Sequence, residues 1–349
     1  MNDPSRIIIS RTDGIGDVML TLPMCGLLKE YFPGTKIYFL ARNYTKPVVE
    51  CCSHIEQFLS YDEFEKSATR QEFLKNINAD IIVHVFPRKS IAYPAKDADI
   101  PTRIGTSHRA YHWITCNERP NLGRKNSKLH EAQLNIALLE SLGVNKEIAL
   151  EALPSYYGFN KIKPLTQNSA ALIDERKFNL ILHPKSHGSG REWGVFNFAK
   201  LIELLPEDKF KIFISGSPDE SVMLKEWISK LPPHVIDITG KMPLEEFISF
   251  INECDGLVAA STGPLHIAAA LNKYTCGLFA PIRPVHPGRW APLGEKAGYM
   301  MIKKNCNDCE NMPQACKCIR LINPFDVSER LQKWYNSKIK LNEPHSMTL

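Results

Sequence analysis

The sequence predicts an α/β protein made of two doubly wound, Rossmann-like domains, and three observations predict it. The chain has 349 residues, more than one hydrophobic core usually holds. Short β-branched or aromatic runs alternate with stretches long enough for helices, as parallel βα units require. This alternation occurs twice, on either side of a linker expected at 153–176. We therefore expect domains at 1–160 and 161–349, with the glycine loops of both sheets at a shared central cleft.

The first half begins with the β-branched run Ile7-Ile8-Ile9, a glycine-containing loop and a helical pattern that starts at Asp17. Further strands are expected at 36–41, 55–60 and 80–86. A helix is expected from about 130 to 142, ending at Gly143.

The second half repeats this architecture. Strands are expected at 178–183, 210–214, 234–238, 256–260 and 274–279. Helices are expected at 195–204, 218–230, 243–252 and 263–271, and a last helix closes the domain from Pro324 to Lys340.

Composition excludes several classes of protein. An apolar share of 44% and a charged share of 23% are those of a globular protein, not of a disordered or fibrous one. The net charge of +5 is too small to call for a nucleic-acid partner. Without an apolar leader or a run of about 18 apolar residues, we expect a cytoplasmic protein that could associate with a membrane. The frequent lysines and arginines of 88–128 favour either a phosphorylated or lipid-borne substrate or a solvated basic face.

The first candidate site is the loop after the first strand, Arg11-Thr12-Asp13-Gly14-Ile15-Gly16-Asp17. Its glycines let the backbone approach a ligand, and its amides can face an anion. The loop lacks the third glycine of a dinucleotide fingerprint and the Gly-Lys-Ser/Thr of a P-loop. Asp17 is either an N-cap or, if burial raises its pKa toward neutrality, a general base.

The second candidate site follows strands of the second half. Ser261, Thr262 and Gly263 open a helix at its positive end, which predicts a cradle for a diphosphate. His266, one turn further on, is either structural or a donor to phosphate. The loop after 178–183 carries Lys185, Ser186 and Arg191, which either clamp phosphate or form an ordinary surface loop. Glu220 either accepts from ribose hydroxyls or only favours a helix start.

Four of the ten cysteines lie close together near the end of the chain. Cys306, Cys309, Cys316 and Cys318 have the spacing C-x2-C-x6-C-x-C, which could hold a structural zinc or pair as disulfides. The other six are typical of buried thiols.

Together these motifs resemble those of glycosyltransferase family 9, which includes the ADP-heptose:lipopolysaccharide heptosyltransferases. The resemblance rests on RTDGIGDVMLTLP (Arg11 to Pro23), Asp237 to Leu244, STGPLHIAAAL (from Ser261), Arg191-Glu192-Trp193 and Ile322 to Val327. This chain departs from the family pattern with Ser261 in place of Asp, Gly194 in place of Pro and Arg191 in place of Lys.

The resemblance implies a GT-B fold, with the acceptor bound by the N-terminal domain and the donor by the C-terminal one. It implies Asp17 as the catalytic base, the loop Arg11, Thr12, Asp13, Gly14 and Gly16 on the acceptor side, and donor contacts from Lys185, Ser186, Arg191, Glu220, Ser261, Thr262, Gly263 and His266.

The expected reaction is inverting and needs no metal or other cofactor. A sugar, expected to be heptose from ADP-heptose, passes to a lipid-linked lipopolysaccharide core acceptor in the cytoplasm, with peripheral contact with the inner membrane. Two other functions stay open at this point: a sugar-nucleotide epimerase, and a non-catalytic nucleotide-sugar or zinc-binding protein.

Overall fold

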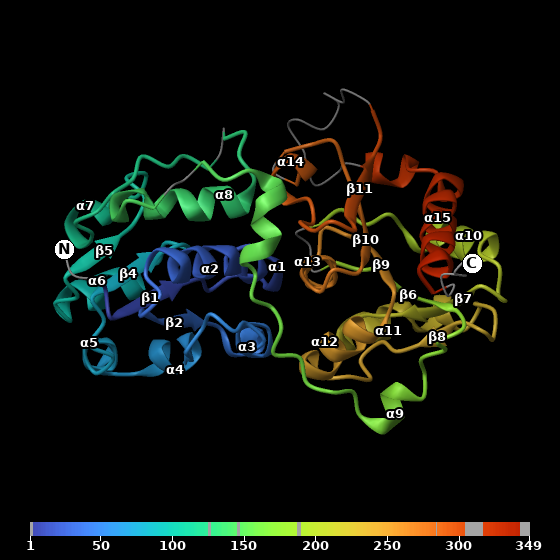
Figure 1. Ribbon diagram of the computed structural model, residues 1–349, viewed down its shortest axis with the longest axis horizontal. Helices are drawn as coiled ribbons and strands as arrows, with labels where there is room; N and C mark the ends of the chain where they lie inside the picture. The colour runs from blue at the N-terminus through green and yellow to red at the C-terminus, as the bar shows by residue number, and fades with distance from the viewer. Residues whose placement is uncertain are drawn as a thin grey trace, which may run out of the picture. The chain divides into compact units, whose positions relative to one another are not determined.

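The computed structural model describes residues 3–124, 127–144, 147–186, 190–283, 285–303 and 317–342. The chain forms two compact units, Met1–Ile162 and Lys163–Leu349, which we call unit 1 and unit 2 (Figure 1). The division falls after residue 162, where the sequence led us to expect it after residue 160.

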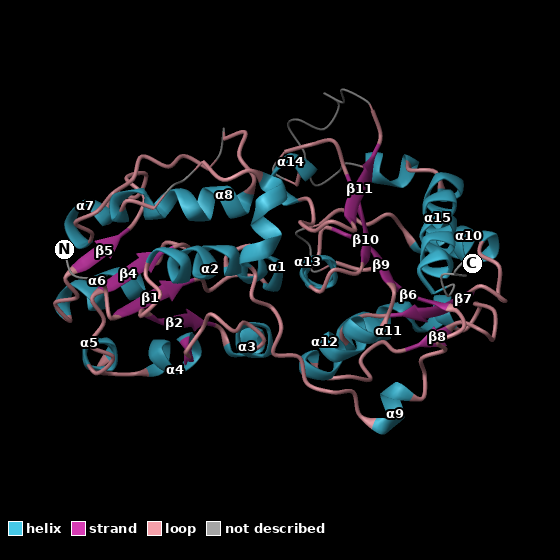
Figure 2. Ribbon diagram, in the orientation of Figure 1, coloured by secondary structure: helices cyan, strands magenta, loops and turns pink. Residues whose placement is uncertain are grey.

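Unit 1 contains a parallel five-stranded sheet in the order β3-β2-β1-β4-β5. Figure 2 shows its helices on both faces of the sheet. The elements, with η for a 3-10 helix, are β1 (Arg6–Ser10), α1 (Ile15–Met19), α2 (Leu22–Tyr31), β2 (Lys36–Ala41), η1 (Asn43–Thr45), α3 (Lys46–Glu50), β3 (Gln57–Ser60), α4 (Tyr61–Lys66), α5 (Arg70–Lys75), β4 (Ile81–His84), α6 (Lys89–Asp97), β5 (Thr102–Ile104), α7 (His112–Thr115), α8 (Glu131–Ile136), η2 (Ala137–Leu142) and η3 (Leu150–Tyr156).

Unit 2 contains a parallel six-stranded sheet in the order β11-β10-β9-β6-β7-β8. If β6 is counted as strand 1 and β11 as strand 6, the order from β8 to β11 is 3-2-1-4-5-6, which is the strand order of dinucleotide-binding folds. The elements are α9 (Gln167–Ala170), β6 (Phe178–His183), α10 (Val195–Leu204), β7 (Phe210–Ile214), α11 (Pro218–Ile228), β8 (Ile236–Asp237), α12 (Leu244–Glu253), β9 (Gly256–Ala260), α13 (Gly263–Ala270), β10 (Tyr274–Phe279), α14 (Pro287–Trp290), β11 (Ala297–Met301), η5 (Cys318–Leu321) and α15 (Pro324–Asn342).

Each sheet is built around a central strand that is buried on both faces. In unit 1, Ile7, Ile8 and Ile9 of β1 are fully buried, and β1 pairs with β2 on one side and β4 on the other. In unit 2, all six residues of β6 are buried between β7 and β9. Strands covered on both faces are mostly apolar, which is why the sequence alone indicates them. The two doubly wound α/β domains predicted from the sequence are confirmed.

The prediction that the linker begins at residue 153 is wrong. Tyr157 and Phe159 are buried in unit 1, and Phe159 forms an antiparallel bridge with Cys52. Aromatic side chains in this stretch therefore extend the core of unit 1 as far as its boundary. In the part of the chain that the structure covers, no helix is both long and apolar enough to cross a membrane.

Candidate active site

Asp17 lies in the first turn of α1, directly after β1. Gly14 occupies the N-cap position and the helix begins at Ile15, so the interpretation of Asp17 as the N-cap is wrong. Gly14 also leaves room for the Asp17 carboxylate, since a Cβ at this position would lie 3.0 Å from Asp17 Oδ2. The loop follows the carboxyl end of β1, at the point where β1 separates β2 from β4 and the order of the sheet reverses. Open α/β sheets bind ligands at this point.

The buried side chain of Arg11 holds the two aspartates of this loop. Its Nε donates to Asp13 Oδ1 over 2.7 Å, and its Nη2 donates to Asp17 Oδ1. Its Nη1 lies 3.1 Å from both Glu131 Oε1 and Asn135 Oδ1 on α8. Among the residues described, none donates a hydrogen bond to Asp17 Oδ2. Arg11 thus fixes the Asp17 carboxylate through one oxygen and leaves the other available.

The cluster around Arg11 has more carboxylates than cations. Arg124 also forms an ion pair with Glu131, so two guanidinium groups face the carboxyl groups of Asp13, Asp17 and Glu131. Burial, opposed by Arg11 and reinforced by the Asp17 charge, raises the pKa of Asp13 to about 6. The loop therefore contains one carboxyl group that gains or loses its proton close to neutral pH.

The basic stretch 88–128 does not form one solvated face. Arg88 Nε donates to Thr12 Oγ1 over 2.5 Å and so braces the same loop. Arg103 donates to the carbonyl of Thr115 over 2.8 Å, and Arg124 is bound to Glu131. Lys128 is exposed. A solvated basic face therefore does not include Arg88, Arg103 and Arg124, whose guanidinium groups bind other groups of the protein.

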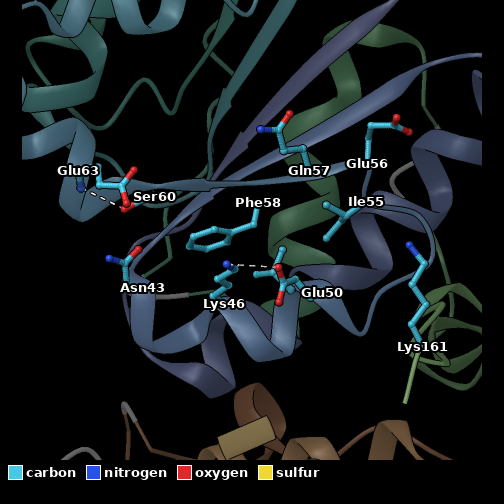
Figure 3. A pocket seen from close by; sticks show the side chains of 11 residues that line it. Asn43, Lys46, Glu50, Ile55, Glu56, Gln57, Phe58, Ser60, Glu63 and Lys161 are labelled. Atoms are coloured by element: carbon cyan, nitrogen blue, oxygen red, sulfur yellow. Dashed lines mark hydrogen bonds and ion pairs between the residues drawn. The ribbon is translucent and has the colours of Figure 1, made fainter. Parts of the chain in front are cut away.

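A groove of about 560 Å³ lies in unit 1 beside η1, α3 and β3. Figure 3 shows the ring of Phe58 in the middle of its side chains, with Asn43 and Ile55 on opposite sides and Lys46 below the ring. The hydroxyl of Tyr44, the residue after Asn43, donates to the carbonyl of Asp13 over 2.7 Å. The groove therefore borders the segment that contacts the Asp13 loop, although no motif in the sequence pointed to it.

The second candidate site lies in unit 2 at the carboxyl ends of the adjacent strands β6 and β9. A Cβ at Gly190 would lie 2.9 Å from the carbonyl oxygen of Ser261, so the two predicted loops touch. Ser186 Oγ donates to the carbonyl of Gly190 over 2.9 Å. The structure thus brings Ser186 and Ser261 into one place, as the sequence led us to expect.

Thr262 and Gly263 are found at the start of α13. Thr262 is the N-cap residue, but its side chain makes no capping hydrogen bond. Its Oγ1 is buried and has no partner among the described residues. Buried hydroxyls are nearly always hydrogen-bonded, so an unpaired one at a positive helix end suits a phosphate oxygen. His266 is buried one turn further along.

Other members of the predicted donor set are already engaged. Lys185 Nζ lies 2.8 Å from Glu192 Oε2, a partner that sequence reasoning missed. Arg191 is half-buried. Trp193, two residues further along the chain, is buried and donates from Nε1 to the carbonyl of Ile322 over 2.9 Å. Glu220 Oε2 accepts from the Ser217 amide over 2.8 Å in a capping box, which confirms its alternative role at a helix start.

The cysteine motif falls largely outside the described residues. Cys306, Cys309 and Cys316 lie there, whereas Cys318 is buried at the start of η5. Within the described ranges, no three His, Cys, Asp or Glu side chains are placed to hold a metal ion.

Comparison with known proteins identifies a family that matches most of the chain. The model of "Glycosyltransferase family 9 (heptosyltransferase)" matches residues 92–320. The lipooligosaccharide heptosyltransferase 2 of Haemophilus influenzae is 24% identical over 315 residues, covering 84% of this chain and 87% of the relative.

Solved structures agree in fold. A family 9 glycosyl transferase from Veillonella parvula has a TM-score of 0.77 at 19% identity, covering 96% of this chain and 98% of its own. The structure of an E. coli heptosyltransferase with ADP-2-deoxy-2-fluoro heptose has a TM-score of 0.68 at 17% identity, covering 94% and 99%.

Proposed function

Because this chain belongs to glycosyltransferase family 9, we propose that it transfers heptose from ADP-heptose to a saccharide acceptor of the lipopolysaccharide core. The observation that carries the proposal within the site is the Asp17 carboxylate, fixed by Arg11 through Oδ1 and available at Oδ2. The donor is inferred from the ADP-sugar analogue that the E. coli heptosyltransferase binds.

In the proposed reaction, an acceptor hydroxyl attacks the anomeric carbon of the donor sugar. Asp17 Oδ2 accepts the proton of this hydroxyl as the new glycosidic bond forms. The bond from the anomeric carbon to the diphosphate breaks on the opposite face, so the anomeric configuration inverts. The products are the extended acceptor, ADP and a proton.

The leaving diphosphate is proposed to bind at the start of α13. The amides of the first turn and Thr262 Oγ1 would donate to its oxygens, and Arg191 and His266 would add charge or a further donor. Lys185 forms an ion pair with Glu192. Because the Glu192 carboxylate offsets its charge, Lys185 is proposed to attract the diphosphate less strongly than an unpaired lysine would. Because these groups stabilise the departing charge, we propose that no divalent metal is required.

The acceptor is proposed to bind unit 1. The groove beside η1 offers the amide of Asn43, the ammonium of Lys46 and the ring of Phe58, a combination that suits hydroxyl groups and the apolar face of a sugar. Because the acceptor is lipid-linked, the protein is also proposed to contact a membrane peripherally.

The test combines product formation with one substitution. Purified protein is incubated with ADP-heptose and a heptose-free lipopolysaccharide core, with and without EDTA. We expect ADP release and an acceptor mass increased by one heptose, unchanged by EDTA. Asp17→Asn removes the base but keeps an oxygen near Arg11, so kcat should fall by about 10²- to 10⁴-fold.

Four outcomes would contradict the proposal or a part of it. Conversion of the donor in the absence of acceptor would favour an epimerase, and donor binding without turnover would favour a binding protein. Near-normal turnover of Asp17→Asn would remove Asp17 as the base. Preference for a UDP- or GDP-sugar would keep the fold and overturn the named donor.

A further inference from the structure

The short helix α7 exposes two adjacent apolar side chains. Trp113 is 63% exposed and Ile114 is 61% exposed, whereas His112 and Thr115 on the other side of the helix are fully buried. Helix α7 packs against α6, and Figure 1 shows it at the margin of unit 1 that also carries β5. Single exposed apolar residues are ordinary, but a protruding pair that includes a tryptophan is typical of an interaction surface.

The indole of Trp113 is held in place although it is exposed. Its Nε1 donates to the carbonyl of Ser107 over 3.0 Å. The guanidinium of Arg119 lies over the ring, 5.1 Å from its centre. Because the ring is already ordered, binding of a partner here would cost little side-chain entropy. The ring also presents an apolar surface beside a cation. Tryptophan in this arrangement is favoured at the boundary between lipid and water.

The charges around α7 are positive. Lys89 Nζ lies 5.8 Å from the centre of the Tyr111 ring, and Arg109 is exposed and faces Tyr111 and His112. In residues 100–130, six lysines and arginines (Arg103, Arg109, Arg119, Arg124, Lys125, Lys128) stand against one acid, Glu118. Arg103, Arg119 and Arg124 donate to groups of the protein. Without these three, Arg109, Lys125 and Lys128 still outnumber Glu118, so the segment is positively charged.

A second exposed pair gives the contrast. Val222 and Met223 on α11 are 78% and 68% exposed. Their segment, 217–228, contains three acids (Asp219, Glu220, Glu226) and one base, Lys225. An anionic surface would attract the α7 pair and repel the α11 pair, so charge and not exposure distinguishes the two.

We propose that Trp113 and Ile114, together with Lys89, Arg109 and Arg119, dock unit 1 onto an anionic phospholipid bilayer. We call these five residues the α7 surface. The two apolar side chains enter the headgroup boundary, and the three cations lie among lipid phosphates. The inference rests on the proposed function, because a lipid-linked acceptor places the reaction at such a bilayer.

The test measures binding of the full chain to vesicles by flotation. Wild type should bind vesicles of phosphatidylcholine with about one-third phosphatidylglycerol and should not bind phosphatidylcholine alone. Raising the salt from about 0.1 to 1 M shortens the screening length from about 10 to 3 Å and should release the protein. Trp113→Ala with Ile114→Ser should weaken binding at least ten-fold, and Arg109→Gln about five-fold.

The matched control is Val222→Ser with Met223→Ser, which removes an even more exposed apolar pair and should leave vesicle binding unchanged. Equal binding to both vesicle types, no salt effect, or unchanged binding of the Trp113→Ala, Ile114→Ser protein would overturn the proposal. So would a wild-type dimer in solution that the same double substitution dissociates, since the pair would then bind a second copy.

The outcome is separable from that of the proposed function. Transfer to a water-soluble core oligosaccharide should be normal in the Trp113→Ala, Ile114→Ser protein, because these two exposed side chains belong to neither candidate site. If wild type binds anionic vesicles but transfers no sugar, the docking surface stands and the proposed reaction fails.

Discussion

Arg11 binds two carboxylates of one loop, and this arrangement makes their protonation interdependent. When Asp13 is ionised, Arg11 divides its charge between Asp13 and Asp17. When Asp13 is protonated, Arg11 loses one of its two anionic partners in this loop and keeps Asp17. The proton on Asp13 therefore changes the charge beside the proposed base, and the rate of the proposed reaction should depend on it.

This interdependence predicts an acidic limit to activity. Burial raises the pKa of Asp13 to about 6, above the usual value of about 3.9, so Asp13 is ionised at pH 7.5 and protonated at pH 5. We expect kcat/KM to fall as the pH drops through 6 and to approach the lower rate of the Asp13→Asn protein, which has a neutral side chain at this position. In Asp13→Asn this limb should move to lower pH, and the rate at pH 7.5 should be reduced. The measurement is kcat/KM from pH 4.5 to 8.5.

Asp208→Asn, at an exposed turn of unit 2, is the matched control and should keep the wild-type profile. Circular dichroism at each pH shows whether the proteins stay folded. An acidic limb that is unchanged in Asp13→Asn would show that another group sets it.

The sequence could place Arg11, Asp13 and Asp17 together, because they share one loop. The sequence could not predict that Glu131, 120 positions further along the chain, forms an ion pair with Arg11. It also could not predict the ion pair of Lys185 with Glu192, because loop residues have no regular spacing that would indicate a contact. Side-chain partners of this kind depend on how the elements pack and leave no periodic signal.

At the scale of elements, α2 and η3 approach each other closely enough to require a glycine. A Cβ at Gly26 on α2 would lie 2.2 Å from the carbonyl oxygen of Tyr156, which belongs to η3. This contact joins the end of unit 1 to its second helix and is the reason that the expected linker begins too early.

Gly26→Ala should therefore destabilise unit 1, because the backbone of η3 must move to admit the methyl group. The expected loss is about 1–3 kcal/mol in the free energy of unfolding, measured by urea denaturation. Gly34→Ala is the control, since nothing lies within 4 Å of a Cβ there. Equal stabilities of the two variants would mean that residues 150–159 do not pack on α2.

The elements that sequence reasoning found are those with a strong local pattern. The strands at 178–183, 210–214, 256–260 and 274–279 and the helix at 195–204 have the predicted bounds. The strands β5 and β11 were missed. β5 has three residues and includes the charged Arg103, and β11 has the part-exposed sequence AGYMM without a β-branched residue. At the edges of a sheet, pairing with a neighbour decides the structure more than composition does.

At the scale of the molecule, each unit has its own sheet and its own loop at a point where the strand order reverses. In unit 1 the loop after β1 carries the proposed base, and in unit 2 the loops after β6 and β9 carry the proposed donor site. Binding of the donor and removal of the acceptor proton are thus assigned to different units. A substitution in one unit should then change one step without changing the other.

Thr262→Val tests this division together with the donor site. Valine keeps the shape of threonine and removes an Oγ1 that is buried without a partner among the described residues, so the melting temperature should be unchanged or raised. If Oγ1 donates to the diphosphate, Kd for ADP measured by calorimetry should rise roughly ten-fold. Asp17→Asn should leave that Kd unchanged while its kcat falls. If Thr262→Val binds ADP like wild type, the hydroxyl does not contact the donor. If Asp17→Asn weakens ADP binding, donor binding and proton removal are not assigned to separate units as proposed.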